Sequence, residues 1–345
     1  MSGHARYIKE MNIQDLFSVR CFAPLPSMEG FAVSGPDTNT FLQGQLTNDV
    51  VGLKAGASQR TGYCTPKGRL LATMLQWRID HETVGHVLPR EIAASTVKRL
   101  RMYVLRAKAA FSAPESAFTA VGLWGDWTDA GMAGLGPDGP NGGVIALGQA
   151  WLIAEAASPT LGSRAWLVGP PADVEQITAT LSGAKPLHES AWWYSEIENA
   201  KPWVWSATVE AFVPQMINFE LVDGVSFTKG CYPGQEVVAR SQYLGKLKRR
   251  MFRTDLDALP PTVSDAVALI GQDIWSDAQP AEPCGQVVAA APRINAQGNP
   301  SEGVALLVQL SLAAWETQGL HIGALDGPLL AARELPYAIP AEASA

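Results

Sequence analysis

Residues Phe227 to Arg240 read FTKGCYPGQEVVAR, and this stretch decides how the whole chain is interpreted. Gly230 and Gly234 give the backbone the freedom that a loop needs where it passes close to a ligand. Pro233 suits the first position of a helix, because the N–H that it lacks is not needed there. The pattern therefore predicts a loop that carries Cys231 to a position just before a helix N-terminus.

Cys231 is the chemically distinctive residue of this loop. The positive end of the helix dipole and the cation of Lys229 would both lower the pKa of its thiol. Free cysteines are more often buried small hydrophobes, but the polar, glycine-flanked surroundings favour a reactive or ligand-contacting thiol. The remaining residues of the motif are expected to shape the loop: Lys229, Gly230, Tyr232, Gly234, Gln235, Glu236 and Arg240.

The composition excludes several classes of protein. Of the 345 residues, 47% are hydrophobic and 17% are charged, so the chain is globular and long enough for two or three packed units. No apolar run approaches the roughly 18 to 20 residues that a membrane span needs. The first residues lack the apolar core of a signal peptide, so we expect a cytoplasmic protein.

Metal and nucleic-acid sites are not indicated. The four cysteines and five histidines are scattered without a C-x-x-C pair, so we expect reduced thiols and no stably bound metal. The formal net charge of −7 makes nucleic acid an unlikely partner. Two basic stretches would form a cationic pocket for a polyanionic small ligand if the fold brings both near the thiol. Their candidate residues are Arg99, Arg101, Lys246 and Lys248.

Residues 190 to 205, SAWWYSEIENAKPWVW, are rich in aromatic side chains. These rings could anchor a core, because aromatic residues bury large areas, or they could stack on a flat heteroaromatic ligand. Trp192 and Trp203 are candidate ligand contacts on the second interpretation. Glu198, a carboxylate among these rings, could accept two N–H bonds from an aminopyrimidine edge.

The periodicity of the chain predicts a mixed α+β fold. A helix is expected over residues 38–50 and a β-hairpin over 62–79 with its turn at 65–68. Strands and helices within 118–183 suggest a small inserted α+β lobe. Further on, short apolar segments alternate with turns, as in a small antiparallel barrel or sandwich. These segments are residues 267–270, 285–290, 303–309 and 329–332.

Five segments together resemble the YgfZ family of folate-binding proteins, which are relatives of the glycine-cleavage T-protein and act in iron–sulfur cluster assembly or repair. The segments are FLQGQLTNDV (41–50), YCTPKGRLLA (63–72), YVLRAK (103–108), FVPQMINFE (212–220) and KGCYPGQEVVAR (229–240). The match covers nearly the whole chain in the right order. The K-G-C-Y-x-G-Q-E signature is specific to this branch of the superfamily.

The resemblance implies a T-protein-like fold, with two α+β lobes around a central channel and a C-terminal antiparallel β-barrel. The channel would bind tetrahydrofolate or a one-carbon derivative, and a pterin-recognising glutamate carries over onto Glu198. In that segment, Glu196 and Ala200 replace the arginine and glycine that the family usually has. The expected units are an N-terminal folate-binding lobe (12–112 and 184–245), the inserted lobe (113–183), the barrel (246–338) and two tails (1–11 and 339–345).

The function implied by the resemblance is that of an accessory factor for iron–sulfur proteins, with Cys231 as its functional thiol. Its expected partners are folate and iron–sulfur client proteins or assembly factors. An ordinary aminomethyltransferase is not expected, because the paired aspartates of that branch are replaced by Ala72 and Thr73 and the carboxylate that aminomethyl transfer needs is missing. A one-carbon transferase with another substrate and a non-catalytic interaction scaffold are the alternatives.

Overall fold

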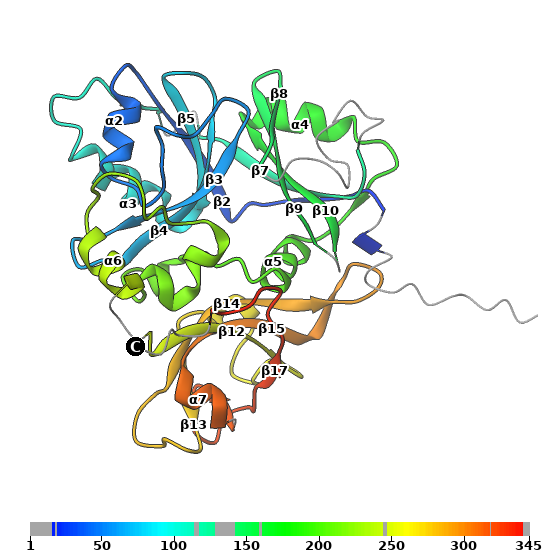
Figure 1. The fold of residues 1–345 in the computed structure, drawn as a ribbon. Helices are drawn as coiled ribbons and strands as arrows, with labels where there is room; N and C mark the ends of the chain where they lie inside the picture. The colour runs from blue at the N-terminus through cyan, green and yellow to red at the C-terminus, as the bar shows by residue number, and fades with distance from the viewer. Residues whose placement is uncertain are drawn as a thin grey trace, which may run out of the picture.

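The computed structural model describes residues 16–17, 19–113, 117–127, 142–158, 161–243, 247–317 and 319–340. These residues form three β-sheets with short helices around and between them (Figure 1). The mixed α+β class predicted from the sequence is therefore confirmed. Among the described residues no helix is both long and apolar enough to cross a membrane.

The first sheet has five antiparallel strands in the order β3-β4-β5-β2-β6. The predicted hairpin is confirmed, since β3 and β4 pair on either side of a turn at residues 65–68. Helix α2 ends at Gln43, so the helix expected over 38–50 was predicted too long. The elements are β2 (Met28–Ser34), α2 (Thr38–Gln43), β3 (Ser58–Cys64), β4 (Leu70–Arg78), β5 (Thr83–Pro89), α3 (Arg90–Arg101) and β6 (Ala110–Phe111).

The second sheet has six strands in the order β11-β1-β7-β10-β9-β8. Two of its strands, β1 and β11, lie outside the predicted inserted segment 113–183, so the sheet joins three separate stretches of chain. The elements are β1 (Cys21–Pro24), β7 (Thr119–Trp124), β8 (Val144–Leu147), β9 (Ala150–Ser158), β10 (Gly162–Gly169), α4 (Pro171–Ala179) and β11 (Lys185–Pro186).

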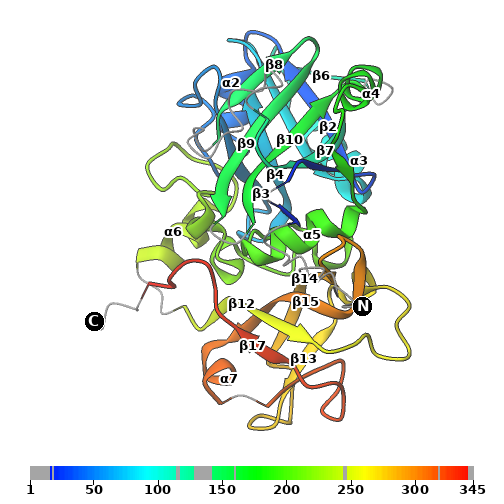
Figure 2. The same cartoon turned by 90° about the vertical axis from the view of Figure 1, so that its right-hand side faces the viewer.

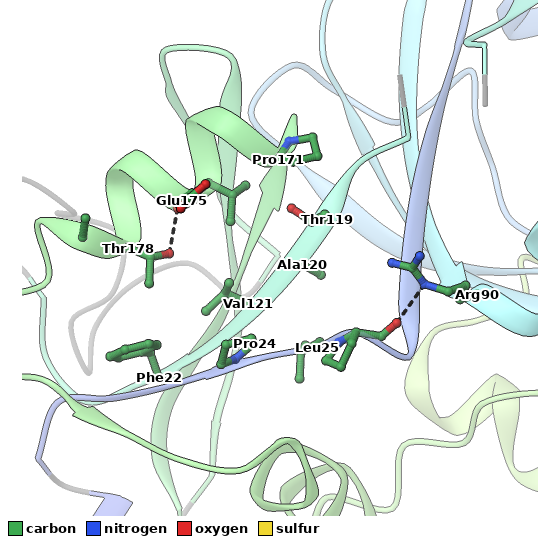
Figure 3. A pocket seen from close by; sticks show the side chains of 13 residues that line it. Phe22, Pro24, Leu25, Arg90, Thr119, Ala120, Val121, Pro171, Glu175 and Thr178 are labelled. Carbon is green, nitrogen blue, oxygen red and sulfur yellow. Dashed lines mark hydrogen bonds between the residues drawn. The ribbon is translucent and has the colours of Figure 1, made fainter. Parts of the chain in front are cut away.

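An apolar cavity of about 640 Å³ lies between α4 and strands β1 and β7 (Figure 3). Phe22, Val121 and Val174 line it, and Arg90 lies at one end. Arg90 donates to the carbonyl of Pro26 at 2.8 Å. The cavity therefore belongs to the outer face of the second sheet, which α4 covers only in part.

The third sheet is antiparallel and curled, with the order β16-β13-β14-β15-β12-β17. The expected barrel is thus present as a curled half-barrel sheet whose edge strands are β16 and β17. Residues 266–269 form a 3-10 turn, not the predicted strand, because Asp265 caps the turn by accepting from the N–H of Val267. The elements are β12 (Arg249–Leu256), η6 (Ala266–Leu269), β13 (Asp273–Ser276), β14 (Gly285–Ile294), β15 (Pro300–Ser311), α7 (Leu312–Thr317), β16 (Leu320–Ile322) and β17 (Ala331–Arg333).

Helix α5 (Glu189–Glu198) lies between the upper two sheets and the curled sheet, as Figures 1 and 2 both show. It packs against β14 and β15. A run of short turns, η3 (Ser206–Thr208), η4 (Pro214–Ile217) and η5 (Phe219–Val222), then leads to the Cys231 loop and to α6 (Gln235–Tyr243). This middle stretch connects the sheets to the loop that the sequence singles out.

Candidate functional site

The Cys231 loop, residues 224–234, contains both buried and exposed residues. Cys231 is exposed, whereas Lys229 and Tyr232 on either side of it are buried. The other three cysteines, Cys21, Cys64 and Cys284, are all buried. Burial raises the pKa of the Cys21 thiol to about 11 and that of Cys64 to about 12. The structure therefore presents one cysteine to solvent and keeps the others in protonated, apolar surroundings.

Lys229 anchors the loop to the segment FLQGQLTNDV. Its ammonium group donates to the carbonyl oxygens of Gln43 and Leu46, each at 2.5 Å. Gln43 is the last residue of α2, where helices leave backbone acceptors unsatisfied and favour a cation, and Leu46 follows three residues later. The ammonium also lies 5.0 Å from the ring centroid of Tyr232. Lys229 thus acts as a C-terminal cap that holds the chain two residues before Cys231.

Gly234 fits the loop against the β3–β4 turn. Its φ of +84° belongs to the region that favours glycine. A Cβ at this position would lie 2.4 Å from the carbonyl oxygen of Thr65 and 2.6 Å from the Cα of Gly68. The turn of YCTPKGRLLA and the turn of KGCYPGQE are therefore in direct backbone contact.

Pro233 does not begin the helix, contrary to the prediction. Helix α6 starts at Gln235, because the left-handed backbone of Gly234 separates it from the turn. Cys231 consequently lies four residues before the first helical residue. The effect of a helix dipole is confined to the first turn, so the expected position of the thiol at the helix end was wrong.

Two further contacts complete the support of the loop. Thr47 accepts from the N–H of Gly62 and donates to the carbonyl of Gly224, at 2.7 Å each. In the segment FVPQMINFE, Gln215 donates to the carbonyl of Val238 in α6 at 2.8 Å. Four of the five segments that carry the family resemblance thus meet at this loop. The outer motif residues Gly230, Glu236 and Arg240 are exposed or half-buried, and so is Gln235.

Glu198 lies at the end of α5 and faces the curled sheet. Its carboxylate accepts from Arg253 of β12 at 2.6 Å. Burial raises the pKa of Glu198, and the nearby Arg253 opposes that rise. The residue expected to recognise a pterin is therefore half-buried, at the junction of α5 and the third sheet.

Trp192 and Trp203 are packed into the core. Their exposed fractions are 0% and 1%, and both rings meet Trp166 edge to face. A Cβ on Gly122 would lie 2.1 Å from the Trp192 ring, so that strand also covers it. Their role as folate contacts stays a prediction and gains no support from this packing.

The four candidate anion-attracting residues lie in different surroundings. Arg99 interacts with the hydroxyl of Tyr63, and Arg101 donates to the carbonyl of Ser112 at 3.1 Å. Lys248 is exposed just before β12, and Lys246 lies outside the described residues. Figure 2 shows α3, which carries the two arginines, and α6 on different sides of the molecule. The contacts of the three described candidates, Arg99, Arg101 and Lys248, give no single cationic pocket around Cys231.

A buried ion network, which the sequence did not reveal, joins the sheets. Glu196 binds Arg60 of β3 and Arg164 of β10, with N–O distances of 3.0 Å to each. Arg60 also binds Glu155 of β9 at 3.0 Å, and Lys201 pairs with the same carboxylate. The arginines and lysine lower the pKa of Glu155 against the opposing effect of its burial. The only signal in the sequence was Glu196 itself, which replaces the arginine that the family usually has.

Thr73 is at one of the two positions where the resemblance implies aspartates in the aminomethyltransferase branch. Its hydroxyl accepts from the N–H of Val204 at 2.9 Å, and both Ala72 and Thr73 are buried. The position is therefore used for packing and backbone support. Among the described residues, no group of three or more histidine, cysteine or acidic side chains could hold a metal ion.

Comparison with known proteins gives consistent matches. The chain is 34% identical over 249 residues to the tRNA-modifying protein YgfZ of Edwardsiella ictaluri, covering 70% of this chain and 73% of that protein. It is 32% identical over 257 residues to the tRNA-modifying protein YgfZ of Sodalis glossinidius, covering 73% and 77%. No protein-family model matches the chain.

The fold is similar to that of glycine cleavage system aminomethyltransferase T from Bartonella henselae. The TM-score is 0.65 at 15% sequence identity, and the match covers 94% of this chain and 89% of that one. At this identity the match shows a shared T-protein-like fold. It does not by itself assign an activity.

Proposed function

The chain belongs to the YgfZ family, and from this premise we propose that it is a tetrahydrofolate-binding accessory protein for iron–sulfur cluster assembly or repair. Cys231 is its functional thiol. The observation that carries this proposal is the exposed Cys231, set in a loop that three other motif segments support. A lone cysteine cannot hold a cluster, which needs several ligands. The thiol therefore acts on a cluster that a client protein holds.

The name of the relatives connects them to tRNA modification. We propose that the clients of this chain include iron–sulfur enzymes that modify tRNA. This link does not require the chain to hold tRNA itself, and the net charge of −7 disfavours such binding. Activity in the cytoplasm, as expected from the sequence, is part of the same proposal.

Tetrahydrofolate is the proposed cofactor, with Glu198 holding its aminopyrimidine edge. The half-buried carboxyl group fits this role, since burial raises its pKa but the neighbouring Arg253 opposes that rise and favours the ionised form that accepts N–H bonds. Folate would supply a one-carbon carrier at the junction of α5 and the third sheet. The buried Thr73, whose hydroxyl already holds the backbone at Val204, disfavours the aminomethyl transfer of the T-protein.

Rescue of a cell that lacks this protein tests the function. The wild-type chain should restore iron–sulfur enzyme activities and the tRNA modifications that depend on them, and Cys231→Ala should not. Cys284→Ala, at a buried thiol, is the matched control and should restore both. Full rescue by Cys231→Ala would remove the thiol from the proposal.

Binding of tetrahydrofolate is tested separately with the purified chain. Calorimetric titration should show binding, and the ligand should raise the melting temperature, because a ligand that binds the native state stabilises it. Glu198→Gln should weaken this binding, whereas Glu175→Gln on exposed α4 should not. If the wild-type chain gives neither heat nor a thermal shift, the folate part fails while the thiol part stands.

A further inference from the structure

The C-terminal end of α3, residues 98–108, presents apolar side chains to solvent. We call this segment the α3 tip. The exposed fractions are 87% for Leu105, 60% for Met102 and 46% for Tyr103. These side chains follow a regular helix and lie within or beside YVLRAK, one of the segments that carry the family resemblance. A run of large exposed apolar residues of this kind is typical of an interaction site.

The backbone of the α3 tip is strained at Leu105, which has the most exposed side chain of the segment. Leu105 has a φ of +46°, a left-handed conformation that leucine rarely adopts. Residues in such conformations persist where the surrounding structure imposes them, and they gather at functional sites. Here the strained residue contributes little to the core, so packing within the chain does not explain it.

Positive charges surround these apolar residues. Among the residues that the structure describes, none of the five cations of the tip forms an ion pair. Arg101 instead donates to the carbonyl of Ser112, and the backbone N–H of Lys108 donates to Asp37. The five cations are Lys98, Arg99, Arg101, Arg106 and Lys108. An uncompensated positive patch on a chain of net charge −7 fits an acidic partner.

A cavity of about 260 Å³ opens beside the tip. It is lined by Tyr63, Arg99, Met102 and the exposed Val209, among others. Its walls thus combine apolar surface with an aromatic ring and a cation. It is large enough to receive an apolar side chain from a partner segment while Leu105 packs against that segment.

We propose that the α3 tip is the docking surface for a segment of a partner protein that carries aspartate or glutamate beside large apolar side chains. Exposed leucine and methionine side chains contribute binding free energy when apolar protein surface covers them. Nucleic acids are instead bound by cations, which contact the phosphates, and by aromatic rings, which stack on the bases. The apolar side chains therefore favour a protein over an RNA. This inference goes beyond the proposed function and requires neither folate nor Cys231.

The test uses the full-length chain and random 16-residue peptides displayed on phage, followed by synthesis of the enriched peptides. Leu105→Asn is the main variant, because asparagine tolerates the left-handed backbone better than leucine and the fold is preserved. Leu329→Asn, at a leucine that is 62% exposed just before β17, is the matched control. Arg106→Glu tests the charge, and tRNA transcribed in vitro is the alternative probe.

Enriched peptides should combine acidic residues with leucine, phenylalanine or tryptophan. Leu105→Asn and Arg106→Glu should each weaken their binding at least tenfold, and Leu329→Asn should leave it unchanged. The proposal is overturned if no peptide is enriched, if the enriched peptides lack acidic residues, or if tRNA binds and Leu105→Asn abolishes that binding. Tetrahydrofolate binding and alkylation of Cys231 should be unchanged in Leu105→Asn, so failure here is distinguishable from failure of the proposed function.

Discussion

Lys229 is buried in a place where a charged ammonium group is costly. Burial lowers its pKa to about 8 from 10.5, against the opposing effects of Asp49 and Cys231. Between these two pH values the unfolded chain binds a proton that the folded chain does not. The contribution of Lys229 to the free energy of unfolding therefore rises as the pH increases from about 8 to 10.5.

Lys229→Met should remove this pH dependence. The free energy of unfolding of the wild-type chain, minus that of the variant, should increase by at most about 3 kcal/mol between pH 7 and pH 10.5. Urea unfolding at intervals of one pH unit measures the difference. Lys248→Met, at an exposed lysine, should show no such trend. Identical pH profiles for the wild type and Lys229→Met would contradict the buried environment.

The sequence identified Lys229 but not its partners. It predicted a cation acting on the thiol of Cys231, and the motif alone gave no reason to expect more. The ammonium group also caps carbonyls that lie 183 and 186 residues earlier in the chain. Contacts over such separations depend on the tertiary fold, which local patterns do not contain.

At the scale of elements, two turns meet with almost no space between them. The KGCYPGQE turn touches the β3–β4 turn at Gly234, where a methyl group would overlap the backbone. A Cβ at Gly230, four residues earlier, would have no atom within 4 Å of it, and the φ of this residue is not positive. The structure therefore requires glycine at position 234, whereas position 230 has room for a side chain.

Gly234→Ala should destabilise the protein by at least about 2 kcal/mol, because the left-handed backbone and the overlap with Thr65 both oppose a Cβ. Gly230→Ala should change the free energy of unfolding by less than about 0.5 kcal/mol. Urea unfolding of the two variants provides the comparison. Equal stabilities would show that the two turns do not pack as described.

Element types were easier to predict than their ends. The β3–β4 hairpin follows from its turn residues, and it is present. The start of α6 was misplaced by two residues, since nothing local shows that Gly234 takes a positive φ against another turn. The segment 267–270 was apolar enough for a strand, but Asp265 caps a 3-10 turn there. At this segment the cap at Asp265 favoured a 3-10 turn over the strand that the hydrophobicity alone had indicated.

At the scale of the whole molecule, one carboxylate connects the two upper sheets to α5. Glu196 receives Arg60 from the first sheet and Arg164 from the second, and the indole N–H of Trp203 donates to it at 2.8 Å. All of these groups are buried. Such a network holds the sheets in one relative position and leaves unpaired charges if a member is lost.

Glu196→Ala should therefore cost about 3 to 5 kcal/mol of stability, because two buried guanidinium groups would lose their partner. Glu175→Ala, on the exposed face of α4, should cost less than about 0.5 kcal/mol. Chemical unfolding followed by tryptophan fluorescence reports the change, since Trp192 and Trp203 lie at the network. A loss below about 1 kcal/mol for Glu196→Ala would argue against a paired buried carboxylate.

The overall architecture was predictable from the family motifs, but the packing and ion pairs of the buried side chains were not. Motif order indicated the T-protein-like fold, which the structural match supports. The tryptophans of residues 190–205 allowed both a core and a ligand site, and only the packing shows Trp192 and Trp203 as buried. Glu196 was visible as a departure from the family pattern, but its partners came from distant strands.

The central claim is that Cys231 is the functional thiol of the protein and that the other three cysteines are not required for its function. The most direct measurement is rescue of iron–sulfur enzyme activity by two reciprocal chains in cells that lack the protein. One chain keeps Cys231 and carries Cys21→Ala, Cys64→Ala and Cys284→Ala; the other carries only Cys231→Ala. At equal cellular abundance, the first chain should restore activity and the second should not. Restoration by the second chain would contradict the account.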